Sequence, residues 1–201
     1  MLSLLKNLDQ FKIILASASP RRFELLKMVG LEFEVRPSHV EEIYEDHLNP
    51  VEYTLANARK KGEKIAASYP HHIIISADTI VVLNNQILEK PNDEKHAYEI
   101  LSQLSGKTHE VITGFGILKK DAVRSVFEHA LTRVSFRKLN RDEIYAYIYT
   151  GEPFDKAGGY GAQGFGSLLI ERVDGCFFNV VGLPLSKLFM TLDHFLLNLQ
   201  K

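Results

Sequence analysis

The sequence predicts a mixed α/β protein rather than a repeat array. Strand-like apolar runs alternate with amphipathic helical patterns along the 201 residues. The run at residues 73–83 is apolar almost throughout, which is typical of a strand buried on both faces of a sheet. Two further long strand-like segments, residues 108–118 and 122–136, are separated by a short polar connection. These observations indicate a mixed α/β fold.

The composition is that of a soluble globular protein with one sizeable core. Apolar residues make up 45% and charged residues 24% of the chain, and we expect one domain over residues 1–201. The formal net charge of -1 gives no general attraction for nucleic acid, so any phosphate binding must be local. The single cysteine, Cys176, excludes an internal disulfide. Neither a basic leader nor an apolar run of membrane length is seen, so we expect a cytoplasmic protein without membrane contact.

The first element is a strand, a turn of small residues and a helix. Residues 12–15 form the strand, and a helical pattern follows as far as Gly30. Ser19 suits the N-cap and Pro20 the first helical turn. The free N–H groups and the positive dipole end of this helix lie beside Arg21 and Arg22, which predicts a phosphate site. A capped helix with solvated arginines is the alternative.

An acidic loop and a second helix come next. Residues 31–35 alternate as in a half-buried strand, and residues 38–48 form a polar, acidic loop that is either solvated or holds a divalent metal. The pattern Asn49-Pro50-Val51-Glu52 predicts a capping box that opens a helix to about Ser68. Arg59 lies near the edge of its apolar face, so it either snorkels to solvent or points into a site.

Asp78 lies in the middle of the apolar strand at residues 73–83. A buried carboxylate that is neither paired, hydrogen-bonded, metal-bound nor protonated costs several kcal/mol. Asp78 is therefore the strongest candidate for a functional residue. The small pair Ser76-Ala77 directly before Asp78 indicates that the strand breaks at a cleft. Asn84-Asn85 fits a hairpin turn, and after the return strand Lys90 lies either at the rim of this cleft or, as a lone lysine more often does, on the surface.

The second half of the chain carries a glycine-rich segment, residues 151–166, with six of the 13 glycines. This density indicates tight turns or a close approach to a ligand. Its letters match a dinucleotide fingerprint, which we reject because no strand precedes it and no helix follows. The elements expected around it are a helix at 93–104 capped by Asn92, a helix from Asn140 to Thr150, strands at 167–173 and 177–181, and a helix starting at Pro184.

Three motifs, in this order, resemble those of the Maf family of nucleoside triphosphate pyrophosphatases. They are Ser17-Ala18-Ser19-Pro20-Arg21-Arg22, Ser76-Ala77-Asp78-Thr79, and the run from Asp155 through Lys156 to Gln163-Gly164. The resemblance extends from about Ile13 to the last helix. It implies an inosine-triphosphatase-like α/β fold (Maf/Ham1), with a mixed central sheet flanked by helices and two lobes around a cleft. It also implies a cleft in which a nucleoside triphosphate is hydrolysed to the monophosphate and pyrophosphate, as in house-cleaning of the nucleotide pool.

The resemblance also implies roles for individual residues. Asp78 matches the proposed base, and Glu42 is expected to bind a divalent cation, Mg or Mn, together with Asp78. The expected substrate-binding residues are Ser17, Arg21, Arg22, Arg59, Thr79, Lys90, Lys156 and Gln163. Arg22 and Lys90 attract the phosphates, whereas Arg21, Thr79 and Gln163 match the subgroup that acts on dTTP, UTP and modified UTP.

The sequence departs from the family pattern at three positions. Arg59 stands where the family commonly has a lysine, Glu89 replaces a glycine and Ala162 an isoleucine. Two alternatives stay open: the same reaction on 7-methyl-GTP or another modified purine nucleotide, and a non-catalytic, nucleotide-sensing regulator of cell division. A homodimer is expected from the resemblance alone.

Overall fold

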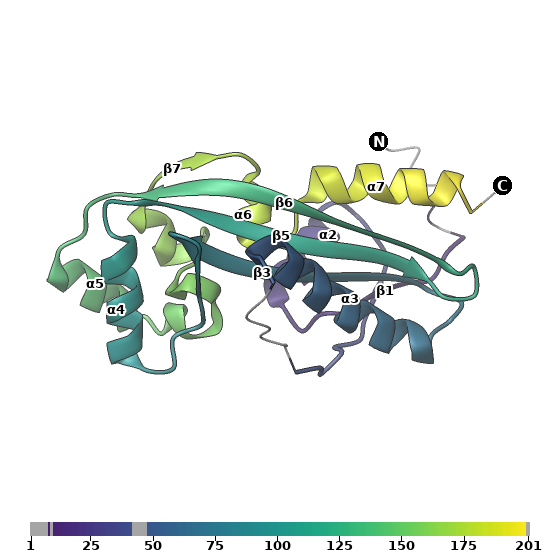
Figure 1. The fold of residues 1–201 in the computed structure, drawn as a ribbon, viewed down its shortest axis with the longest axis horizontal. Coiled ribbons are helices and arrows are strands. Elements are labelled where there is room, and N and C mark those ends of the chain that lie inside the picture. The colour runs from purple at the N-terminus through teal and green to yellow at the C-terminus, as the bar shows by residue number, and fades with distance from the viewer. Residues whose placement is uncertain (1–7, 9, 42–47, 200–201) are drawn as a thin grey trace. The chain divides into compact units, whose positions relative to one another are not determined.

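The computed structural model describes residue 8, residues 10–41 and residues 48–199. Within these described residues, seven strands form one mixed sheet in the order β2-β1-β3-β5-β6-β7, with β4 paired to β3 (Figure 1). β1 runs parallel to β2 and β3, whereas β4 and β7 are antiparallel to their neighbours. The strands are β1 (Ile13–Leu15), β2 (Glu34–Val35), β3 (Ile73–Leu83), β4 (Gln86–Leu88), β5 (Thr108–Lys119), β6 (Arg124–Phe136) and β7 (Ile170–Asp174).

Three of the described helices begin where the capping residues predict. Ser19 accepts a hydrogen bond from the backbone N–H of Arg22, and both predicted capping boxes are present, at Asn49 and at Asn140. One cap is shifted, because Asp93 rather than Asn92 caps its helix. The α-helices are α2 (Pro20–Met28), α3 (Pro50–Ser68), α4 (Glu94–Leu104), α5 (Arg141–Ile148), α6 (Phe177–Val181) and α7 (Leu185–Leu197). Among the described residues, no helix combines the length and the apolarity needed to span a membrane.

The chain divides into two compact units. Unit 1 comprises residues 1–78, 113–130 and 182–201, and unit 2 comprises residues 79–112 and 131–181. The long strands β3, β5 and β6 each continue from one unit into the other. Whether the units act as one domain, as the sequence analysis predicts, stays a prediction.

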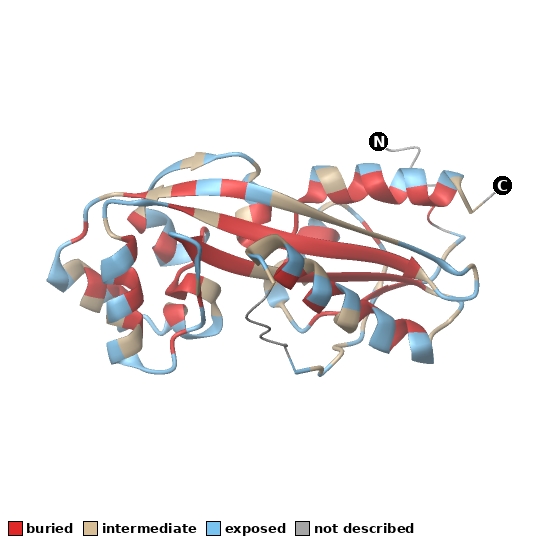
Figure 2. Ribbon diagram, viewed as in Figure 1, coloured by how far each residue is buried: buried red, intermediate tan, exposed pale blue. Residues whose placement is uncertain are grey.

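In unit 1, α3 lies on one face of the sheet and α7 on the other (Figure 1). Between these helices, β1 and unit 1's part of β3 are buried throughout, as Figure 2 shows. Glycines allow α3 to approach closely. A Cβ on Gly114 would lie 2.7 Å from the backbone of Thr54, and one on Gly62 would lie 2.7 Å from Ser76 Oγ. The rotation of α3 about its axis is therefore fixed by contacts with β3 and β5.

In unit 2, α4 and α5 pack beside each other on an apolar cluster built from β3, β5 and β6. A histidine lies in this cluster. His109 is 1% exposed, and its Nε2 lies 2.6 Å from the hydroxyl of Tyr160. The rings of His109, Phe136 and Tyr160 meet edge to face. Burial lowers the pKa of His109 from 6.5 to about 4, so the imidazole is neutral at pH 7.

This burial makes folding stability depend on pH. In the unfolded chain His109 becomes protonated as the pH falls below 6.5, whereas in the folded chain it becomes protonated only near pH 4. Stability therefore falls as the pH falls through this window. We expect the His109 contribution to lower the free energy of unfolding by about 2 kcal/mol between pH 7 and pH 5. Urea titrations of wild type and His109→Gln at both pH values measure it: the variant should lose this part of the pH dependence. The matched control, His194→Gln at an exposed position of α7, should keep it.

Two predicted strands differ from the structure. The prediction of a strand at 177–181 is wrong, because these residues form the helix α6. A run of five largely apolar residues fits a strand or a helix. Contacts with distant residues favour the helix, because Asn179 Nδ2 donates to the Val111 carbonyl and to Thr132 Oγ1. The strand expected at 167–173 starts only at Ile170, after a 3₁₀ helix. The glycine-rich segment follows helix α5 and contains three 3₁₀ helices, η1 (Glu152–Asp155), η2 (Ala157–Gly159) and η3 (Gly164–Leu169).

Candidate functional site

The predicted phosphate turn of unit 1 holds one arginine rigidly. Arg22 is only 9% exposed; its Nε donates to the Gly182 carbonyl at 2.9 Å and its Nη1 to Ser17 Oγ at 3.1 Å. Ser17 Oγ also accepts a hydrogen bond from the backbone N–H of Ser19 at 3.2 Å. Arg21 is less buried than Arg22. The structure therefore brings together Ser17, the helix N-terminus and Arg22, and it fixes the plane of the Arg22 guanidinium.

The buried carboxylate of Asp78 is paired with a lysine that the sequence analysis missed. Lys61 Nζ lies 2.6 Å from Asp78 Oδ1, and the side chains are 13% and 6% exposed. Lys61 lies three residues after Ala58 and four before Ile65, on the buried face of α3. That spacing could have identified it, since residues three and four apart share a helix face.

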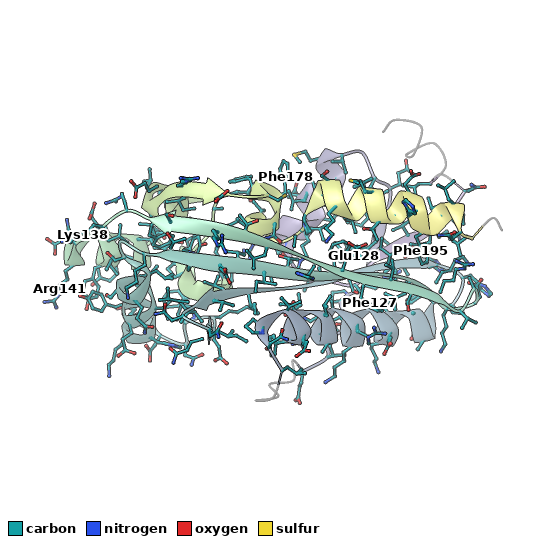
Figure 3. All side chains as sticks on the ribbon, turned by 45° about the horizontal axis from the view of Figure 1, so that its top comes forward. Phe127, Glu128, Lys138, Arg141, Phe178 and Phe195 are labelled. Carbon is teal, nitrogen blue, oxygen red and sulfur yellow. The ribbon has the colours of Figure 1, made fainter. Side chains whose placement is uncertain are left out.

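Arg59 lies elsewhere on α3. Its guanidinium is 4.0 Å from the ring centre of Phe127 and 3.6 Å from the Glu63 carboxylate, and its side chain is 52% exposed. Figure 3 shows Phe127 on the side of β6 that faces α3 and Glu128 on the side that faces α7. The substrate contact of Arg59 stays a prediction, but Lys61 is the cation of α3 that pairs with Asp78.

The predicted metal site is described only in part. Glu42 lies outside the described residues, and the described residues contain no group of three or more potential metal ligands. They contribute Asp78, whose oxygens are hard donors. This donor chemistry fits Mg²⁺ or Mn²⁺, which bind proteins through one or two carboxylates and take further ligands from water and phosphate.

The other predicted residues belong to unit 2. Thr79 is partly buried in β3, Lys90 and Gln163 are exposed, and Lys156 Nζ donates to the Glu152 carbonyl at 2.6 Å. One backbone hydrogen bond links two of these regions: the N–H of Gly158, two residues after Lys156, donates to the carbonyl of Glu89, next to Lys90. The structure thus brings the Lys90 and Lys156 segments together.

A pocket of about 270 Å³ opens elsewhere in unit 2. Its lining residues are Val82, Asn84, Asn85, Thr108, His109, Glu110 and Arg133. None of them is a predicted site residue, so the pocket adds nothing to the chemistry assembled above.

Comparison with known proteins places the chain in a family. The family model described as Maf-like protein matches residues 12–195. The chain belongs to the Maf family. One Maf relative, named dTTP/UTP pyrophosphatase, from Desulforamulus reducens, is 47% identical over 176 residues, covering 88% of this chain and 92% of the relative. A Maf protein of the same name from Bacillus cereus is 46% identical over 184 residues, covering 92% and 95%.

Two solved structures of other proteins resemble the fold of this Maf chain. A HAM1 protein from Coxiella burnetii aligns with a TM-score of 0.53 at 14% identity, over 92% of this Maf chain and all of that protein. The Ham1 protein of Staphylococcus aureus aligns with a TM-score of 0.51 at 15% identity, over 93% and 98%. These similarities confirm the predicted Ham1-like α/β fold.

Proposed function

We propose that this chain is a pyrophosphatase that hydrolyses dTTP, UTP and modified UTP to the monophosphate and pyrophosphate. The observation that carries the reaction type is the buried ion pair of Asp78 and Lys61, whose charged oxygen and nitrogen atoms lie 2.6 Å apart. The substrate class comes from the relatives named dTTP/UTP pyrophosphatase, which match about nine-tenths of the chain. Removing damaged or surplus nucleotides from the pool is the role that follows.

Asp78 acts as the general base in this proposal. An ionised carboxylate takes the proton from the water that attacks the α-phosphorus, while the bond from that phosphorus to the bridging oxygen of pyrophosphate breaks. Lys61 compensates the negative charge of the buried carboxylate and limits where it can point. The leaving pyrophosphate is multiply charged, and the fixed guanidinium of Arg22, with Lys90, stabilises it.

A divalent cation, Mg²⁺ or Mn²⁺, held by Asp78 and Glu42 would neutralise phosphate charge when bound. Base selection is assigned to Gln163, Arg21 and Thr79. The exposed amide of Gln163 offers both a donor and an acceptor, which suits the edge of a pyrimidine. The nearly neutral chain, with a formal net charge of -1, gives no reason to expect nucleic acid as a partner. The homodimer and the cytoplasmic location are further parts of the proposal.

A panel of nucleoside triphosphates, assayed for pyrophosphate release with Mg²⁺ and with Mn²⁺, tests the proposal. We expect dTTP and UTP to have kcat/KM values at least about tenfold above those of the other common nucleotides, because Gln163 can pair with only some bases. Preferential hydrolysis of 7-methyl-GTP would move the substrate to the purine alternative. Tight binding of triphosphates without hydrolysis under either metal would favour the regulator.

A further inference from the structure

The glycine-rich segment folds around the carboxylate of Glu152, a residue to which the proposed function gives no role. Glu152 Oε1 accepts hydrogen bonds from the Tyr147 hydroxyl at 3.0 Å and from the Gly166 N–H at 3.1 Å. Its Oε2 accepts one from the Phe165 N–H at 2.9 Å. Burial and the negative charge of Glu152 raise the pKa of Tyr147, so the hydroxyl keeps its proton and donates. One side chain therefore ties the beginning of the segment to α5 and to its end.

Three of the segment's six glycines, Gly161, Gly164 and Gly166, have a packing reason in this arrangement. A Cβ on Gly164 would lie 2.7 Å from Glu152 Oε2, and one on Gly161 would lie 2.9 Å from Lys156 Cε. A Cβ on Gly166 would lie 2.3 Å from the Gly161 carbonyl oxygen. The close approach that the glycine density predicts is thus an approach to Glu152, to Lys156 and to the segment's own backbone.

Both candidate substrate residues of the segment lie inside the closed loop. Lys156 Nζ donates to the Glu152 carbonyl at 2.6 Å and to Asp155 Oδ1 at 2.5 Å. Gln163 is exposed and stands directly before Gly164, whose backbone rests on the Glu152 carboxylate. Gln163 is the N-cap residue of η3 (Gly164–Leu169), and its side chain makes no capping hydrogen bond to that helix. The backbone conformation around Gln163 thus positions its side chain, and Glu152 fixes that conformation through its contacts at residues 164–166.

The geometry points to Glu152 as a positioning residue for base recognition: its carboxylate fixes the loop that presents Gln163 to the base of the nucleotide. This inference rests on the proposed function, in which Gln163 reads the base. A carboxylate suits the task because it only accepts hydrogen bonds and has two oxygens to share among three donors. A glutamine of the same shape would turn an N–H toward at least one of the backbone N–H groups, because Phe165 and Gly166 donate to different oxygens. Two N–H groups that face each other cannot form a hydrogen bond, so the loop is held less tightly in this variant.

The test is Glu152→Gln, assayed with dTTP, UTP and the other triphosphates. We expect KM for dTTP and UTP to rise about tenfold and kcat at saturation to stay within about twofold, because Asp78 and Lys61 belong to unit 1. The preference for dTTP and UTP over other bases should fall by about the same factor as KM rises. A parallel fall of kcat and thermal stability with unchanged base preference would overturn the inference, since it indicates a structural role only.

The matched control is Glu143→Gln. Glu143 lies on α5, and its carboxylate accepts hydrogen bonds from the Asn140 N–H at 2.8 Å and from Arg137 Nη1 at 2.7 Å. This variant loses the same charge and a similar set of hydrogen bonds, but none to the loop. It should lower thermal stability and leave KM and base preference unchanged. If Glu152→Gln does not fold, Tyr147→Phe removes one donor to the same carboxylate, and KM should then rise about threefold.

Amide hydrogen exchange separates the inference from the proposed function. Exchange at the Phe165 and Gly166 N–H groups should speed up at least about tenfold in Glu152→Gln and stay unchanged in Glu143→Gln, without any substrate. A wild-type protein that hydrolyses no triphosphate would refute the proposed function, while the exchange result would still decide whether Glu152 closes the loop. Unchanged exchange at both amides, or unchanged base preference in an active Glu152→Gln protein, would refute the inference.

Discussion

Asp78→Asn is expected to lower kcat by about 10³-fold, because an amide cannot take the proton of the attacking water. The variant should remain folded. The amide oxygen can still accept the hydrogen bond from Lys61, so the arrangement of β3 and α3 is kept. Pyrophosphate release from dTTP measures the loss, and circular dichroism checks the fold. Turnover close to wild type would refute the role of Asp78 as the base.

The partner lysine separates catalysis from stability. Asp78→Asn removes the negative charge that lies 2.6 Å from the Lys61 ammonium, whose side chain is 13% exposed, and we expect the free energy of unfolding to fall by about 1–3 kcal/mol. Adding Lys61→Met removes the ammonium as well, so the double variant should regain most of this stability and none of the activity. Recovery of activity in the double variant would contradict the mechanism.

A surface pair in the same unit provides the matched control. Lys119 Nζ lies 2.5 Å from Asp121 Oδ1, and the two side chains are 14% and 32% exposed. Hydrogen bonds from Lys119 and His71 lower the pKa of Asp121 to about 2, so the carboxylate is ionised at pH 7 as an Asp–Lys pair requires. Asp121→Asn should change kcat by less than about twofold, because this pair lies outside the proposed site.

Local signals were sufficient for elements whose neighbours in sequence decide their structure. The capping boxes at Asn49 and Asn140 were predicted and are confirmed, because each needs only residues three apart. The turn at Asn84-Asn85 is confirmed as well, with φ values of 50° and 64° that suit asparagine. The helix α6 could not be predicted from its five residues, since the contacts of Asn179 with Val111 and Thr132 fix it from elsewhere in unit 2.

The candidate site shows the same division. Asp78 was found because its position inside an apolar strand is visible in the sequence. Lys61 was missed, and Arg59 was chosen instead, because α3 carries several cations near its apolar face and the spacing alone does not show which of them meets Asp78. Nonlocal contacts, such as the fit of Gly62 against Ser76 Oγ, decide that. The anchoring role of Glu152 could not be predicted either, since its donors lie 13 and 14 residues further along the chain.

Arg22→Lys is expected to lower kcat/KM for every triphosphate by about 10²-fold, although the charge is kept. The guanidinium of Arg22 makes two directed hydrogen bonds inside the protein, to the Gly182 carbonyl and to Ser17 Oγ. A lysine has one nitrogen and cannot make both while facing a phosphate. The free energy of unfolding should also fall by about 1–3 kcal/mol, because a buried hydroxyl and a carbonyl lose a charged donor.

Two comparisons show whether the loss belongs to phosphate binding. Arg21→Lys should change the preference among bases more than the rate with any one of them, whereas Arg22→Lys should affect all triphosphates alike. Ser17→Ala combined with Arg22→Lys should cost less than the sum of the two single variants, because Ser17 and Arg22 share the 3.1 Å contact. Additive losses, or a base-dependent loss in Arg22→Lys, would mean that Arg22 does not clamp the phosphates. The exposed Arg36, paired with Glu34 at 2.8 Å, is the control, and Arg36→Lys should leave kcat/KM unchanged.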